Sequence, residues 1–277
     1  MNWSKAKNWL IVLFIGVNLF LVFTIIRTDV QSSTIDRDTI ANIVNILQEN
    51  GIAVEADVIP QSMPDLGPID VMNSLSDYDA LAALVLDANA QKAADKPEYT
   101  SGSKRLWFEG DMIYYEDSSP QQPYEGLSQS RAQSIALELL RTYGFNMERA
   151  QASAAEQADG SYIVTVSQKI DQYVLFDSYF YVHIAPEGLR SLAGSWSVPS
   201  GSQDILTNES ARVKSIVSVL LDFTRNEERI QNGSSQIVQI DLGYMTKAKD
   251  TYHKNATAMP VWLIRCSDGK VYDYEAR

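Results

Sequence analysis

Cysteine is nearly absent from this sequence. Cys266 is the single one among 277 residues, so the chain cannot form an internal disulfide. A chain of this size that leaves the cytoplasm without disulfides fits a bacterial envelope better than a eukaryotic secretory route. Basic residues are also scarce, with 23 Lys and Arg against 35 Asp and Glu and a formal net charge of −12. An acidic surface repels polyanions, so we expect no nucleic-acid partner and no polyanionic substrate.

Histidines and recognisable catalytic motifs are equally rare. The two histidines, His183 and His253, have no cluster of Cys or carboxylates at metal-ligand spacing near them, so we expect no metal and no cofactor. The chain has no His-Glu-x-x-His, no Gly-x-Ser-x-Gly and no phosphate-binding glycine loop. Ser101-Gly102-Ser103-Lys104 matches a Ser-x-x-Lys pattern, but the Lys-Thr-Gly strand that this chemistry needs is missing. The sequence therefore predicts a protein that is not an enzyme.

One long apolar run is present, and it lies at the amino terminus. Residues 9–27 carry no charge before Arg27, and roughly 18 residues of helix span about 27 Å, enough to cross a hydrocarbon core. Lys5 and Lys7 precede the run, which places residues 1–8 in the cytoplasm. A cleaved signal peptide is the alternative, but the run is long for one and ends without small residues for a peptidase. We expect a single-pass transmembrane helix at 9–27, a stalk at 28–35 and extracytoplasmic domains.

Asn18 interrupts this helix near its middle, where a side-chain amide has no water to bind. Helical spacing places a set of apolar residues on the same face as Asn18. This face consists of Ile11, Phe14, Ile15, Asn18, Leu21, Val22 and Ile25. Two interpretations remain open: the amide bonds to its own backbone, or the face packs against other transmembrane helices.

The remaining chain has the composition of a folded protein, with 45% hydrophobic and 21% charged residues. Periodicity predicts the elements of a first domain at 36–117. These are a helix at 36–50, a strand at 52–60, a helix at 77–90 and a hairpin of strands 104–108 and 112–116. Residues 118–126 contain Pro120 and Pro123 and mark the boundary to a second domain at 127–277.

The second domain is expected to begin with a helix at 128–143, capped by Ser128 and ended by Gly144. A second helix should begin after Thr207 or Asn208 and include Val213. The expected strands are 149–156, 162–169, 173–185, 189–198, 236–246, 258–266 and 270–275. Helix followed by strands thus occurs twice, so an internal duplication is plausible. We expect the α+β class, with two domains of antiparallel sheet and packed helices after the transmembrane helix.

Aromatic residues concentrate in the expected strand 173–185. Tyr173, Phe176, Tyr179, Phe180 and Tyr181 either form core and cross-strand pairs or present a partner-binding face. For the second interpretation, the candidate residues are Tyr173, Tyr179 and Tyr181.

Stretches at both ends of the chain resemble one family. They are Met1-Asn2-Trp3-Ser4-Lys5-Ala6-Lys7, Val17-Asn18-Leu19-Phe20-Leu21, Ile240-Asp241-Leu242-Gly243-Tyr244, Met259-Pro260-Val261-Trp262 and Asp268-Gly269-Lys270-Val271-Tyr272. Together with the chain length, these residues resemble the YycI (WalI) family.

The resemblance implies a single-pass membrane protein of low-GC Gram-positive bacteria, with an α+β fold of two domains related to the carboxy-terminal domains of YycH. Such proteins, together with YycH, contact the sensor histidine kinase WalK (YycG), largely through transmembrane helices. They thereby adjust signalling to the response regulator WalR (YycF), which governs cell-wall metabolism. The resemblance does not fix whether signalling rises or falls.

Two other function classes remain. The helix-plus-strands repeat suggests a PepSY-like extracytoplasmic module that binds a ligand or inhibits a protease, and a deep apolar pocket would favour it. A cell-wall enzyme would need convergent carboxylates, or a serine and a base, in a cleft.

Overall fold

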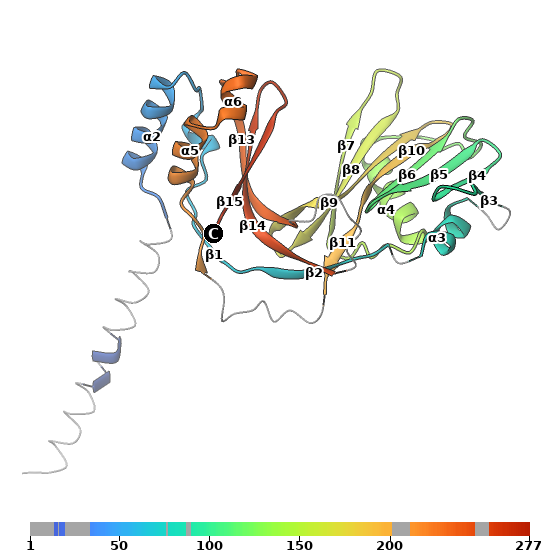
Figure 1. Cartoon of the computed structure of the whole chain (residues 1–277), viewed down its shortest axis with the longest axis horizontal. Helices are drawn as coiled ribbons and strands as arrows, with labels where there is room; N and C mark the ends of the chain where they lie inside the picture. Colours follow the sequence, from blue (N-terminus) through green and yellow to red (C-terminus); the bar gives the residue numbers. More distant parts are fainter. Residues whose placement is uncertain are drawn as a thin grey trace, which may run out of the picture. The chain divides into compact units, whose positions relative to one another are not determined.

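The computed structural model of the chain describes residues 14–15, 17–19, 34–75, 77–86, 90–200, 211–246 and 255–277 (Figure 1). The fold is mixed α+β and is dominated by antiparallel strands, as the sequence predicted. The chain forms two compact units, each assembled from separate stretches. The first unit takes its described residues from the chain up to Asp65, from Arg212–Asp241 and from Ile264–Tyr274. The second takes them from Leu66–Ala211, Leu242–Leu263 and Glu275–Arg277.

Most of the predicted transmembrane segment, 9–27, lies outside the described residues. Within the described part of the chain, no helix combines the length and the apolar character needed to cross a bilayer. Residues 14–15 and 17–19 are helical, and the Asn18 Nδ2 donates a hydrogen bond of 2.8 Å to the Phe14 carbonyl oxygen. The self-bonded state of Asn18 is therefore geometrically available.

The first unit is built on helix α2 (Arg37–Glu49) and helix α5 (Ile216–Thr224), which contact each other. Asp36 begins α2 by accepting a hydrogen bond of 2.7 Å from the Thr39 backbone N–H. Both helices bury one apolar stripe. The buried residues are Ile40, Ile43 and Leu47 of α2 and Ile216, Val219, Leu220 and Phe223 of α5. Helix α6 (Glu227–Asn232), strand β15 (Val271–Glu275) and parts of β13 (Ile237–Thr246) and β14 (Asn255–Cys266) complete the unit.

Two predictions in the first unit are wrong. The expected strand at 52–60 is a single bridge between Ala53 and Gln236, followed by the 3-10 helix η1 (Ala56–Val58). Its apparent alternation fails because only its ends, Ile52 and Ile59, are buried, so no strand face is formed.

The second correction concerns the helix expected after Thr207 or Asn208, both of which lie outside the described residues. Helix α5 instead begins at Ile216, where the Ser215 side chain accepts from the Val217 N–H at 3.3 Å. Val213 precedes the helix and donates its backbone N–H to the Pro64 carbonyl at 3.1 Å. Ser215 is therefore the N-cap residue of α5.

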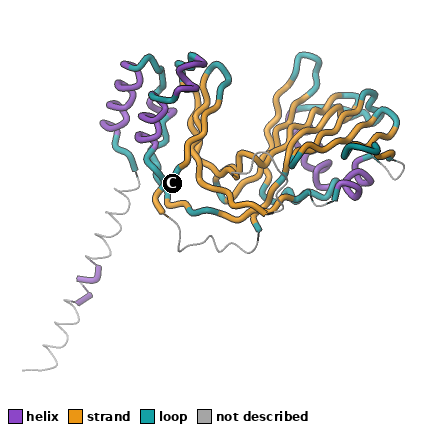
Figure 2. Tube along the Cα trace, viewed as in Figure 1, coloured by secondary structure: helices purple, strands orange, loops and turns teal. Residues whose placement is uncertain are grey.

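The second unit contains most of the sheet, coloured orange in Figure 2. Its strands are the parts of β13 and β14 within Leu242–Leu263, together with β2 (Ile69–Asn73), β3 (Gln91–Lys92), β4 (Glu98–Ser101), β5 (Lys104–Glu109), β6 (Met112–Asp117), β7 (Ala150–Glu156), β8 (Tyr162–Ile170), β9 (Tyr173–Ala185), β10 (Gly188–Ser195) and β11 (Ser197–Pro199). The order of hydrogen-bonded neighbours from β8 to β3 is β8-β9-β10-β6-β5-β4-β3, and all of these pairs are antiparallel. A separate small sheet pairs β1 (Asp65–Leu66) with β12 (Ala211–Arg212).

Strand register separates two faces of this sheet. One row of directly paired residues runs across five strands and is buried. It consists of Val164, Val182, Leu192, Tyr115 and Leu106. These residues belong to the core formed with helices α3 (Tyr78–Val85) and α4 (Gln129–Thr142). The neighbouring row points to the other face because side chains alternate along each strand. It consists of Thr165, Tyr181, Ala193, Tyr114 and Trp107, none of which is buried.

Strand β9 is interrupted by a bulge at 176–178. On strand β8, Ser167 pairs with Tyr179, but the next residue, Gln168, pairs with Leu175. Asp177 in the bulge accepts hydrogen bonds from the Thr246 backbone N–H, at 2.8 Å, and from the Thr246 hydroxyl. The bulge therefore connects β9 to the end of β13. It also changes the direction of the β9 side chains that come before residue 176.

Candidate functional site: a tyrosine-lined cavity

The second unit contains a cavity of about 380 Å³. Its walls come from the end of α3, the paired ends of β5 and β6, the loop 119–124, the end of α4 and the start of β10. Its apolar lining consists of Leu84, Val85, Leu86, Leu139 and Leu189. Pockets of about 300–1,000 Å³ with an apolar lining and a few polar groups are the usual sites for small ligands. The cavity therefore has the size of a small-ligand site and combines apolar with polar side chains in its lining.

Three tyrosines reach this cavity from three different elements. Tyr115 lies in the buried row of β6, Tyr143 is the C-cap residue of α4, and Tyr124 lies in the loop. The loop is fixed at Tyr124, whose backbone N–H donates to the Pro186 carbonyl at 2.8 Å. Burial raises the pKa of Tyr143 to about 12 and also raises the pKa of Tyr124 and Tyr115. All three phenols are consequently protonated at neutral pH and can donate hydrogen bonds.

An acidic and a basic residue occupy paired positions at the same end of the sheet. Asp117 on β6 pairs in register with Lys104 on β5. The Asp117 carboxylate is 8% exposed and accepts from the Ser103 hydroxyl at 2.7 Å and from the Ser119 N–H at 3.0 Å. The Lys104 side chain forms no ion pair or hydrogen bond with any other described residue. Asp117 thus has partners in the protein, whereas Lys104 is available.

The loop that closes the cavity packs against Gly188. A Cβ atom placed on Gly188 would lie 2.8 Å from the Pro120 Cβ and 3.1 Å from the Gln122 carbonyl oxygen. Gly188 also has φ +143°, a conformation that L side chains rarely adopt. Glycine is therefore needed for the loop to approach the β9–β10 hairpin this closely.

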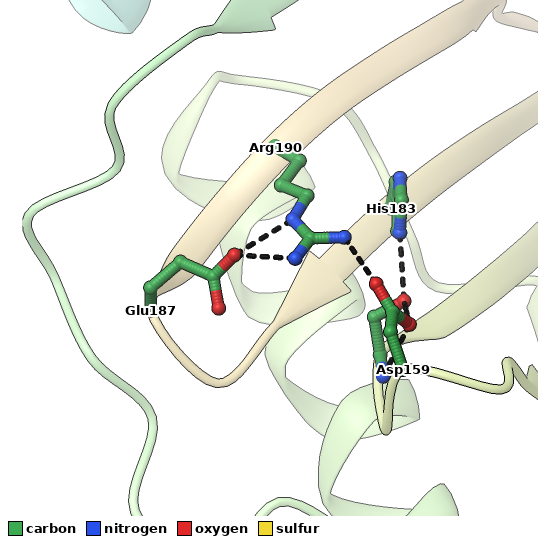
Figure 3. A network of polar contacts seen from close by, with 5 residues as sticks. Asp159, His183, Glu187 and Arg190 are labelled. Atoms are coloured by element: carbon green, nitrogen blue, oxygen red, sulfur yellow. Dashed lines mark hydrogen bonds and ion pairs between the residues drawn. The ribbon is translucent and has the colours of Figure 1, made fainter.

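A second polar cluster surrounds His183 on β9 (Figure 3). The Ser161 hydroxyl, which is fully buried, donates to Asp159 Oδ1 at 2.6 Å and lies 2.8 Å from His183 Nε2. Arg190 binds the other oxygen of Asp159 at 2.6 Å and binds Glu187 through Nη2 at 2.5 Å. Hydrogen bonds from Ser161 and Arg190 hold the pKa of Asp159 well below its usual range. Burial, followed by the Arg190 charge, lowers the pKa of His183.

The order of these groups differs from that of a catalytic triad. In a triad, the histidine lies between the serine and the carboxylate and takes the serine proton. Here, Ser161 lies between Asp159 and His183 and its hydroxyl donates a hydrogen bond to Asp159, so the histidine ring donates to the serine oxygen. The cluster fastens the turn before β8 to the β9–β10 hairpin.

The sequence-predicted aromatic residues of β9 separate into two places. The rings of Tyr179 and Tyr181 lie 5.0 Å apart on the sheet face opposite the helices, where Tyr181 is 49% exposed. Tyr173 lies before the bulge and contacts Tyr244 with a centroid distance of 6.3 Å. Phe180 is fully buried in the core. The structure thus brings together two of the three candidate residues for a partner-binding face, Tyr179 and Tyr181, and places Tyr173 elsewhere.

The open face also carries a second aromatic pair. Trp107 and Tyr114 stack with centroids 5.1 Å apart, and the Arg105 guanidinium lies 4.6 Å above the Trp107 ring. Of the predicted transmembrane face, only Phe14, Ile15 and Asn18 lie among the described residues.

No cation or thiol site adds to this picture within the described residues. They contain no group of three or more His, Cys, Asp or Glu side chains placed to hold a metal ion. Cys266 is buried, and burial raises its pKa to about 11, so the thiol stays protonated.

Comparison with solved structures identifies proteins of similar fold. The sequence matches no protein-family model and no curated protein. The crystal structure of YycH from Bacillus subtilis matches with a TM-score of 0.50 and 12% identity, over 84% of this chain and 61% of YycH. An uncharacterized protein from Eubacterium rectale matches with a TM-score of 0.45 and 12% identity, over 78% of this chain and 79% of that one. The Bacillus megaterium YpeB C-terminal domain matches with a TM-score of 0.33 and 12% identity, over 73% and 98% of the two chains.

The likeness to YycH concerns the fold, which both chains share despite their low identity. This chain corresponds to less than two thirds of the length of YycH.

Proposed function

We propose that this chain is a non-enzymatic, membrane-anchored regulatory protein of the YycI type. Together with YycH, it contacts the sensor histidine kinase WalK and modulates the WalR signalling that controls cell-wall metabolism. The observation that supports this proposal best is the YycH-like fold over 84% of the chain. A YycI resemblance at the two chain ends implied a fold of this kind independently of the structure.

The proposed mechanism is a population shift in the kinase. A transmembrane helix that packs better on one signalling state stabilises that state by the difference in its affinity for the two states. Asn18 would contribute by exchanging its bond to the Phe14 carbonyl for one to a partner helix. Such an interhelical bond is worth roughly 0.6–2 kcal/mol.

The test is site-specific crosslinking of the full-length protein to WalK and to YycH in membranes. We expect Asn18→Leu to weaken crosslinking to at least one partner, and the control Val17→Leu on the neighbouring helix face to leave it unchanged. Equal crosslinking of both variants and the parent would refute the role of Asn18. If the parent protein forms no crosslink to WalK or to YycH, the proposed partners are refuted.

A second candidate function is an extracytoplasmic ligand-binding module of the PepSY type, which the cavity in the second unit favours. Filling the cavity with Leu139→Trp should abolish ligand binding while the protein stays folded. The two functions are compatible, because a ligand in the outer part can act on an anchored regulator.

A further inference from the structure

We propose that the cavity binds a small carboxylate ligand with an apolar body, whose carboxylate lies against Lys104, Tyr124 and Tyr143. The proposal rests on the second candidate function, ligand binding, and names the chemical class of that ligand. Neither the partners WalK and YycH nor the membrane anchor enters the argument.

The charge of the ligand follows from which polar groups of the cavity are available. Among the described residues, no hydrogen bond occupies the hydroxyl of Tyr124 or Tyr143, and no ion pair occupies Lys104. Protonated phenols and an ammonium group are donors. A carboxylate accepts several such bonds at once, and bonds between charged groups are roughly twice as strong as neutral ones.

A cationic ligand fits the same cavity less well. Its natural partner would be Asp117, whose Oδ1 already accepts hydrogen bonds from Ser103 and Ser119, so that Oδ2 is the oxygen left for a ligand. Lys104 lies directly across the strand pair from Asp117 and would repel a second cation. The Lys104 charge, which no other described residue pairs with, therefore favours an anionic ligand over a cationic one.

The apolar body follows from the opposite wall. Leu84, Val85 and Leu86 at the end of α3 and Leu139 of α4 line the cavity without any polar side-chain atom. Leu84 is 58% exposed, which places an apolar side chain where a ligand can cover it. Burial of alkyl groups stabilises a complex by about 0.8 kcal/mol for each CH₂ group. A short alkyl chain is therefore expected to add affinity.

Isothermal titration calorimetry of the full-length protein tests the charge. The probes are octanoate, octylamine and octanol, which share the chain length and differ in the head group. We expect octanoate to bind about tenfold or more tightly than octanol, and octylamine to bind weakest. Tighter binding of octylamine, or equal binding of all three, would overturn the assignment. A second experiment titrates N-acetyl-Leu-Leu as the free acid and as the amide. If the free acid binds more tightly than both its amide and octanoate, the ligand carboxylate is a peptide carboxyl terminus.

Variants of the parent protein test the location. Lys104→Met and Tyr143→Phe should each weaken octanoate binding, by about tenfold or more for Lys104→Met, whereas the exposed Lys96→Met should leave it unchanged. Thermal unfolding followed by circular dichroism checks that each variant is folded. Octanoate binding that survives Lys104→Met and Tyr143→Phe would overturn the site. Crosslinking to WalK is measured separately, so failure of this inference and failure of the regulatory proposal give different results.

Discussion

Replacing Gly188 by alanine should displace the loop that closes the cavity. Alanine at φ +143° costs about 1–3 kcal/mol in backbone strain. Its Cβ would lie 2.8 Å from Pro120 and 3.1 Å from the Gln122 carbonyl, and overpacking of this kind costs a further 1–3 kcal/mol or so. We therefore expect Gly188→Ala to lower the free energy of unfolding by about 2–6 kcal/mol.

Gly110→Ala is the matched control, because Gly110 lies in the β5–β6 turn with φ +57° and has no other atom within 4 Å of a built Cβ. This variant should cost only the left-handed strain, about 1–2 kcal/mol. Urea unfolding followed by far-ultraviolet circular dichroism gives both values. The difference between them reports the overlap with the loop together with the difference in backbone strain between φ +143° and φ +57°.

The overlap should also reach the ligand site, because the displaced loop carries Tyr124. Octanoate affinity should fall in Gly188→Ala and stay unchanged in Gly110→Ala. If Gly188→Ala and Gly110→Ala lower the free energy of unfolding equally, the loop moves away from the new Cβ atom without loss of stability. Unchanged octanoate binding in Gly188→Ala would show that the loop position does not set the shape of the cavity.

Three further predictions concern single contacts. Trp196→Phe keeps the ring in the core but removes its Nε1–H bond of 2.9 Å to the Asn146 carbonyl, so urea unfolding should show a loss of about 1–3 kcal/mol. Asn226 caps α6: its Oδ1 accepts from the Arg229 N–H at 2.8 Å, and its Nδ2 donates to the Tyr274 hydroxyl at 2.9 Å. Asn226→Ala removes both bonds and should cost at least about 0.5–2 kcal/mol by the same assay. Burial lowers the pKa of His183, so the unfolded chain takes up a proton near pH 6.5 before the folded one does, and stability should fall as pH drops below that value. His183→Gln should flatten this part of the pH profile in urea unfolding.

Each of these predictions has a clear contrary result. A Trp196→Phe variant as stable as the parent would mean that the Asn146 carbonyl finds another partner. No change in Asn226→Ala would assign the start of α6 to its packing alone. A pH profile that is the same with and without His183 would show that its ring titrates alike in the folded and unfolded chain.

Much of the sheet was predictable because its strands have one buried face and end at clear turns. The prediction for β9 has the observed bounds, Tyr173–Ala185, and the β5–β6 hairpin and α4 were also predicted within about two residues. Short elements fixed by tertiary contacts were missed: α6 depends on the Asn226 cap and on a buried Arg229, not on a periodic apolar stripe. The domain bounds 36–117 and 127–277 and the membrane anchor stay predictions.

The cavity could not be read from the sequence, because its walls come from five segments. Tyr115, Tyr124 and Tyr143 are separated along the chain, and only the register of β5 and β6 and the end of α4 bring them together. The sequence contains one signal: Tyr124 follows Pro123 in the polar stretch 118–126, where the prolines indicate a boundary. A large aromatic residue in a polar loop often packs back on the fold.

Because the first unit is assembled from separate stretches, its first helix is synthesised long before the residues against which it packs. Helix α2 is made early, but its partner α5 begins only at Ile216, and the unit is completed by strand residues up to Tyr274. At about 5–20 residues per second, the apolar stripe of α2 waits on the order of 10–30 s for that partner. During this interval the stripe is exposed to chaperones and to incorrect contacts. Substitutions that weaken α5 should therefore lower the yield of folded protein in cells more than they lower the stability of the finished chain.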